Sequence, residues 1–185
     1  MGLFAEVFLL TLGLIMKKLT CSDIEMAVIG YFGYRRNTIV PNVSYGLNIH
    51  EVDLLIVSKS SYCTEIEIKI SISDLKADLR KQHQHKSNRI KYFYFAIPEG
   101  LQEKALPLIP ERAGLIIVKQ GVGDSNWCEI IKAPIVNNEA RALTEKELVK
   151  LGYLASLRIW NLKRIIRGLK NENSNFRNNT GNNKT

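Results

Sequence analysis

The chain has 185 residues, of which 45% are hydrophobic, so we expect one domain with a sizeable buried core. Its formal net charge of +8 indicates an anionic partner, such as nucleic acid or an anionic membrane surface. The three cysteines are far apart and form no CxxC pair. This spacing argues against a disulfide framework or a zinc knuckle and favours a reducing compartment, so a cytoplasmic location is expected.

Residues 1–15 form an apolar extension that we do not expect to belong to the working domain. The run LFAEVFLLTLGLIM, at 3–16, is too short to span a bilayer comfortably and contains Glu6. No basic region precedes it and no small-residue cleavage site follows it, so it lacks the form of a secretory signal. No stable membrane partner is expected, and a peripheral helix that anchors the chain to a membrane is the alternative.

Sequence patterns predict where three helices begin. Ser22 to Glu25 has the S-x-x-E form of a capping box, and Thr144 to Glu147 repeats it. A third, polar helix begins at Ser73 or Asp74, either of which can act as the N-cap. The predicted helices cover residues 22–33, 73–90 and 144–169.

Six apolar runs rich in β-branched or aromatic residues predict strands. The first is interrupted by Pro41 and Gly46, which is typical of an irregular or edge strand, and the last is a short edge strand. The runs are 37–47, 50–58, 62–71, 91–98, 113–121 and 127–134. Their order among the helices indicates an α/β sandwich with a mixed central sheet, occupying residues 16–136.

The C-terminal part of the chain holds most of the excess positive charge. Residues 141–185 contain ten Lys or Arg and three Glu. A long basic C-terminal helix with one apolar stripe is expected within residues 137–170, followed by an Asn-rich, disordered tail at 171–185. The helix could clamp nucleic acid or mediate a homodimer, and a simply solvated basic helix is the alternative.

Charged side chains alternate with apolar ones in two neighbouring predicted strands. Glu65, Glu67 and Lys69 share one face of their strand, and Glu51 and Asp53 share one face of the strand before it. In a hairpin these acidic faces lie on the same side of the sheet, where clustered carboxylates repel unless a cation lies between them. Mg²⁺ is the simplest such cation, and Mn²⁺ can substitute for it. Glu51 and Glu65 are expected to be supporting or solvated residues.

This spacing resembles the PD-(D/E)xK nuclease superfamily, which has the restriction-endonuclease-like fold. Asp53 in EVDLLIV and Glu67-Ile68-Lys69 in EIEIKIS match its motif, with Val52 in the place of the motif's proline. The segment from EIEIKISISDLKAD through YFYFAIP to GLIIV is similar to the small MmcB-type branch, which is associated with DNA repair and phages. The resemblance covers about residues 22–120.

The resemblance implies a three-layer sandwich that hydrolyses DNA phosphodiester bonds with Mg²⁺. Asp53, Glu67 and the backbone carbonyl of Ile68 would hold the metal, and Lys69 would activate or position the attacking water. Glu25 is a further candidate ligand because the superfamily often has an acid on the first helix, although helix capping explains it equally well. A catalytically inactive nucleic-acid-binding module of the same fold is the alternative function.

Other polar residues near the predicted site are secondary candidates. Asp74 and Asp78 lie four apart on one helix face and recur in the related branch, which suggests a supporting role in positioning. His50 could support the site or be structural. A basic cluster could bind DNA phosphates, with a solvated helix end as the alternative. That cluster consists of Lys81, His83, His85, Lys86 and Arg89.

Overall fold

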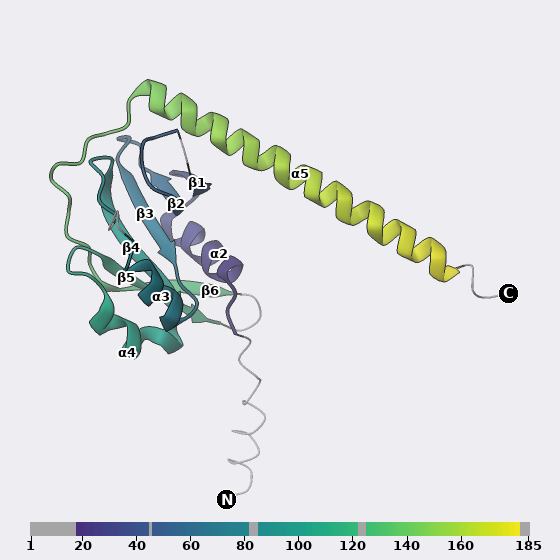
Figure 1. Cartoon of the computed structure of the whole chain (residues 1–185), viewed down its shortest axis with the longest axis horizontal. Coiled ribbons are helices and arrows are strands. Elements are labelled where there is room, and N and C mark those ends of the chain that lie inside the picture. Colours follow the sequence, from purple (N-terminus) through teal and green to yellow (C-terminus); the bar gives the residue numbers. More distant parts are fainter. Residues whose placement is uncertain (1–17, 45, 82–84, 122–124, 182–185) are drawn as a thin grey trace, which may run out of the picture.

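The computed structural model describes residues 18–44, 46–81, 85–121 and 125–181, with side chains described as far as residue 172. Its centre is a six-stranded sheet in which the strands follow one another in chain order (Figure 1). The strands are β1 (Thr38–Val43), β2 (Val52–Val57), β3 (Cys63–Ile68), β4 (Ile90–Pro98), β5 (Gly114–Gln120) and β6 (Asn126–Lys132).

The sheet is mixed, as the sequence predicts. β1, β2 and β3 form an antiparallel meander, β3, β4 and β5 run parallel, and β6 returns antiparallel to β5. β1 and β6 are the two ends of this order, so the prediction of edge strands is confirmed. Pro41 is tolerated in β1 because an edge strand needs fewer ladder donors.

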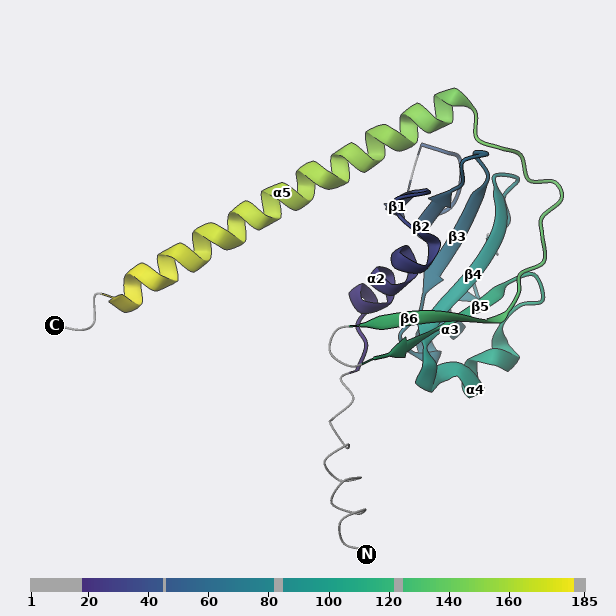
Figure 2. The same ribbon diagram turned by 180° about the vertical axis from the view of Figure 1, so that it is seen from behind.

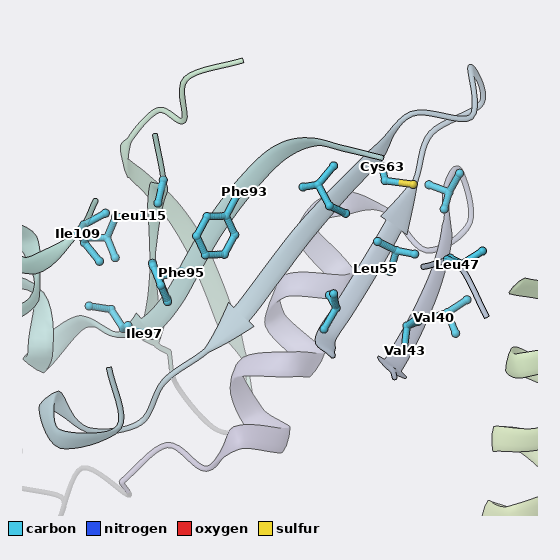
Figure 3. Close-up of a cluster of buried hydrophobic side chains, with 14 of the residues drawn as sticks. Val40, Val43, Leu47, Leu55, Cys63, Phe93, Phe95, Ile97, Ile109 and Leu115 are labelled. Carbon is cyan, nitrogen blue, oxygen red and sulfur yellow. The ribbon is translucent and has the colours of Figure 1, made fainter. Parts of the chain in front are cut away.

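Helices cover both faces of the sheet. On one face lies α2 (Cys21–Phe32) (Figure 2). Its buried Ile24 and Val28 belong to one core cluster with Ile66 and Ile116 of the sheet. On the other face, α3 (Ile72–Asp78), α4 (Gln102–Ala105) and the start of α5 (Glu145–Gly181) cover the second core. Figure 3 shows this second core, which includes the labelled Leu55, Phe93, Phe95 and Leu115.

Two helices begin at other residues than the sequence predicts. Thr20 caps α2, because its hydroxyl accepts the Asp23 N–H at 3.2 Å and the Asp23 carboxylate accepts the Thr20 N–H at 2.8 Å. This capping box lies two residues before the predicted one. In α3 the N-cap is Ser71, whose hydroxyl accepts the Asp74 N–H at 3.1 Å, so neither Ser73 nor Asp74 is the cap.

Helix α3 ends at Asp78, twelve residues before the predicted end. The predicted second half has polar side chains but no apolar stripe to hold a helix on the sheet. The chain instead reaches His85, whose φ of 54° lies in the left-handed region, and that residue is buried against the sheet. Tertiary contacts of this polar segment therefore override its local helical pattern.

Helix α5 starts with the predicted capping box, in which Thr144 and Glu147 exchange backbone-to-side-chain hydrogen bonds of 2.9 and 3.3 Å. Its first turns pack Leu151 and Leu154 on the sheet, and the rest extends away from the domain (Figure 1). Beyond that contact the helix exposes a set of apolar side chains: Ile159, Trp160, Leu162, Ile165, Ile166 and Leu169.

The bounds of α5 differ from the predicted division of the C-terminal region. Residues 137–144 form a non-helical connection, and the helix continues to Gly181, through most of the segment for which composition predicts disorder. Extending an existing helix needs no new nucleation, so a polar sequence can follow on from a packed start. The predicted extension at 1–15 lies outside the described residues. Within the described part of the chain, no helix is long and apolar enough to cross a membrane.

Candidate functional site

The β2–β3 hairpin brings the predicted acidic residues and the lysine together. Its register places Leu55 opposite Glu65, so Asp53 and Glu67 fall at neighbouring positions of the two strands. Lys69 Nζ lies 2.7 Å from Glu67 Oε2 and 3.8 Å from Asp53 Oδ2. Asp53 Oδ2 also accepts the backbone N–H of Ile68 at 2.8 Å, which fixes the carboxylate against the neighbouring strand.

This group is buried at one end and open at the other. Glu67 and Lys69 are 2% and 5% exposed, whereas the side chain of Asp53 is 37% exposed. Burial, together with the charges of Asp53 and Asp78, raises the pKa of Glu67 to about 7 despite the opposing charge of Lys69. Glu67 Oε1 is buried and has no hydrogen-bond partner among the described residues, so one carboxylate oxygen is available to a cation.

Lys69 is held as a cation by several carboxylates. Burial opposes its charge, but the carboxylates of Glu67, Asp78 and Asp53 outweigh burial and raise the pKa of Lys69 above its ordinary value. The Asp78 contact is direct, with 3.2 Å between Lys69 Nζ and Asp78 Oδ1. The same Asp78 oxygen lies 2.5 Å from Lys81 Nζ. Asp78 therefore holds the Lys69 ammonium group through a direct ion pair.

The other two predicted acids, Asp74 and Glu25, lie in different surroundings. Asp74 is exposed in the first turn of α3, where its backbone N–H bonds the Ser71 cap. Glu25 is half-buried on α2, and burial followed by the charge of Asp53 raises the pKa of its carboxyl. Since Thr20 and Asp23 form the capping box, capping does not explain Glu25.

A buried hydrogen-bond network behind this group was not predicted. Glu65 is fully buried rather than solvated, and its Oε1 lies 2.6 Å from His50 Nε2 and 2.5 Å from His85 Nδ1. The other ring nitrogen of His85, Nε2, lies 2.6 Å from Asp78 Oδ2. The network thus runs from His50 through Glu65, His85 and Asp78 to Lys69.

The histidine network controls the charge of its members. Burial opposes the imidazolium form of His85, but hydrogen bonds to Asp78 and Glu65 and their charges outweigh it and raise the pKa of His85 to about 9. Burial likewise opposes the charge of Glu65, yet hydrogen bonds from His50 and His85 hold its pKa below its usual range. The alternation of side chains along β3 predicts that Glu65 and Glu67 share one face of the strand. This local pattern carries no information about the segment before β4, which brings His85 to that face.

The members of the predicted basic cluster lie in different environments in the structure. His85 is 3% exposed, and both of its ring nitrogens contact carboxylates of the buried network. It is therefore not placed to contact a phosphate at the surface. Arg89 is occupied by Glu147 of α5, with 2.8 Å between Nε and Oε1. His83 lies outside the described residues. Lys81 is exposed but is paired with Asp78, with 2.5 Å between Nζ and Oδ1. Lys86 is exposed at the surface.

Two adjoining cavities lie on the side of the network where His85 and Asp78 are found. One, of about 440 Å³, is lined by Asp78, His85, Lys86, Phe93 and Arg112 among others. A second, of about 430 Å³, shares Lys86 and Arg112 with the first. Arg112 was not singled out from the sequence, since nothing in its local pattern marks it. It adds a cationic group next to Lys86.

No family model and no curated protein sequence matches the chain. Among solved structures, the chain is similar to the SPO1766 protein of unknown function from Silicibacter pomeroyi, with a TM-score of 0.57 and 16% sequence identity. The similarity covers 81% of this chain and 93% of that protein. At this identity the likeness shows a shared fold alone: an α/β fold with a mixed six-stranded sheet.

Proposed function

We propose that the protein is a metal-dependent nuclease of the PD-(D/E)xK type, with the restriction-endonuclease-like fold, that hydrolyses DNA phosphodiester bonds. The observation that carries this proposal is the convergence of Asp53, Glu67 and Lys69 from two adjacent strands, with both carboxylates within 3.8 Å of the lysine nitrogen. Helices on both faces of the mixed sheet are consistent with the three-layer sandwich expected of that fold. A role in DNA repair or phage DNA processing rests on the sequence resemblance alone.

The donor set fits Mg²⁺, or Mn²⁺ in its place. Asp53, Glu67 and the backbone carbonyl of Ile68 would hold the ion, with Glu25 as a fourth candidate. All are oxygen donors, and Glu67 Oε1 is a buried oxygen without a hydrogen-bond partner among the described residues. When bound, the ion lowers the pKa of an attached water and stabilises charge on the phosphate. The exposure of Asp53 leaves a side through which a phosphodiester can approach.

The geometry also indicates how Lys69 contributes. In the metal-free site the neighbouring carboxylates raise the pKa of Lys69 and favour its protonated, cationic form. From its position beside Asp53 and Glu67, it can orient the attacking water or stabilise charge on a scissile phosphate. Asp78 holds the ammonium group in place through its 3.2 Å contact.

A specific observation favours the second candidate, a catalytically inactive nucleic-acid-binding module of the same fold. The Lys69 ammonium lies within 3.8 Å of three carboxylates, so it already compensates much of their mutual repulsion without a metal ion. In that case the basic surfaces would bind nucleic acid and the buried charges would be structural. The two candidates differ in their dependence on a divalent metal.

Cleavage of supercoiled plasmid and of labelled oligonucleotides, with Mg²⁺ or Mn²⁺, tests the proposal. Asp53→Asn and Lys69→Met should each reduce the cleavage rate by about 100-fold or more, because each removes a charged group that acts at the scissile phosphate. Lys104→Met, which changes an exposed lysine of α4, is the matched control and should cleave normally. Equal cleavage by all four proteins would overturn the proposal. Absent cleavage combined with salt-sensitive, metal-independent DNA binding would favour the inactive module.

A further inference from the structure

We propose that His50, Glu65 and His85 form a second metal site, one that takes a borderline transition-metal ion such as Zn²⁺. Three segments of the chain deliver one ligand atom each: His50 just before β2, Glu65 within β3, and His85 in the segment before β4. His50 Nε2, Glu65 Oε1 and His85 Nδ1 all lie within 4.8 Å of one another. This site does not depend on the nuclease proposal.

The chemistry of the donors separates this site from the acidic one. Two imidazole nitrogens and one carboxylate oxygen form the donor set that zinc uses in many sites with three protein ligands. The group at Asp53 and Glu67 offers oxygen alone, which suits Mg²⁺. The two groups therefore favour different ions even though Glu65 and Glu67 are neighbours on one strand face.

His85 is oriented as a ligand would be. Its Nε2 lies 2.6 Å from Asp78 Oδ2, which leaves Nδ1 directed at Glu65. Metal-binding histidines commonly donate their second ring N–H to a carboxylate in this way, because that bond fixes the tautomer and the ring direction. The ring also stacks on Phe93, with 4.4 Å between the centroids. Two contacts therefore hold the ring before any ion binds.

Glu65 supplies the independent sign of a missing partner. Its side chain is fully buried, both histidines contact the same oxygen, and Oε2 has no hydrogen-bond partner among the described residues. An unsatisfied carboxylate oxygen in a core costs free energy unless a cation or a donor engages it. The oxygen that meets both histidines is Oε1, so an ion bound there would engage Oε2 as the second oxygen of a bidentate carboxylate.

Binding requires a small rearrangement. Ligands of tetrahedral zinc at bonds of about 2.0–2.1 Å are about 3.3 Å apart. The nitrogen-to-oxygen distances here are 2.5 and 2.6 Å, so the side chains would separate by less than about 1 Å. In the metal-free protein the three side chains form the hydrogen-bonded network. A bound ion would replace the protons that lie between the nitrogen and oxygen atoms. Bound ion would tie the segment before β4 to the sheet and fix Asp78, which in turn holds Lys69.

Metal binding to the full chain tests the site. The chain is treated with a chelator and titrated with Zn²⁺, and with Co²⁺ as a spectroscopic probe, in excess Mg²⁺. We expect one ion per chain and a rise in melting temperature. His50→Gln and His85→Gln should each weaken binding by at least about tenfold, since each removes one ligand. Asp53→Asn, in the acidic site, should bind Zn²⁺ as the wild type does.

Three results would overturn the proposal. They are no binding by the wild-type chain, unchanged binding by both histidine variants, and loss of binding in Asp53→Asn, which would place the ion in the acidic site. Circular dichroism checks that each variant is folded. If His85→Gln does not fold, the less buried His50→Gln decides the question alone.

Discussion

Glu65 and Glu67 are two residues apart on one strand face, yet their surroundings give them opposite charge preferences. Glu65 is kept ionised by two histidines, whereas Glu67 is pushed toward its neutral form by burial and by neighbouring carboxylates. Spacing alone predicted that Asp53, Glu67 and Lys69 would meet, because strand alternation and a hairpin are local rules. It could not predict the role of Glu65, since that depends on a histidine twenty residues away in a segment without a clear pattern.

His85 makes the stability of the metal-free protein depend on pH. Its pKa is raised from 6.5 to about 9, so its contribution is fully present below pH 6.5 and is lost as the pH rises through 9. A loss on the order of 3 kcal/mol in the free energy of unfolding is expected across that window. Urea denaturation of chelator-treated protein at pH 6.5 and pH 9.5 measures it.

Two described carboxylates that contact His85, those of Glu65 and Asp78, have lowered pKa values and titrate below this window. The change linked to Glu67 falls between about pH 4.5 and 7, so it overlaps only the start of the window. Among the described residues, the imidazole of His50 is a further neighbour, with 4.9 Å between its ring centroid and that of His85, and His50→Gln serves as its control. The variant His85→Gln should lose most of the pH dependence. An equal decline in wild type and His85→Gln would contradict the assignment.

Among the elements, helix α2 was predicted correctly, but the residue at which it begins was not. Two residues of the right type, Thr20 and Ser22, precede the apolar run, and the chain uses the first. Thr20→Ala should lower the free energy of unfolding by about 1 kcal/mol, because the Asp23 N–H loses its acceptor. Ser22→Ala, at the predicted cap, is the matched control and should have a much smaller effect. Equal losses would show that Thr20 is not the cap.

Under the proposed function, the exposed part of α5 is the element that we expect to contact nucleic acid outside the site. Lys163, Arg164 and Arg167 are exposed on this helix, well beyond its contact with the sheet. Their triple alanine variant should bind DNA more weakly and with a lower salt dependence. The slope of log K against log salt should fall by about 0.9 for each phosphate that the helix no longer neutralises.

A charge-matched variant controls for the overall charge of the chain. Arg35, Lys59 and Lys104 are exposed on the domain, so their triple alanine variant removes the same three charges elsewhere. Affinity measured by fluorescence anisotropy at several salt concentrations compares the two variants. If both variants change the slope equally, α5 is not a specific contact surface.

At the scale of the whole molecule, the sheet with helices on both faces followed from the order of apolar runs and helical patterns. The predicted edge strands and the mixed sheet are confirmed, and Pro41 is the local signal that marks the first strand as an edge. The long C-terminal helix was predicted as well, but its continuation to Gly181 was not, since that depends on extension of a packed helix. The short α3 was not predicted, since its end is set by tertiary contacts. The proposed chemistry depends on the charged groups that β2 and β3 position within this architecture.

Plasmid cleavage by Glu67→Gln tests the proposed nuclease activity most directly, since the substitution keeps the shape of the side chain and removes its charge. We expect that wild type cleaves with Mg²⁺ or Mn²⁺ and stops with chelator, and that Glu67→Gln is at least about 100-fold slower. Glu103→Gln, at an exposed position of α4, should match the wild type. Cleavage by Glu67→Gln at the wild-type rate, or undiminished wild-type cleavage in chelator, would contradict the proposed metal-dependent mechanism.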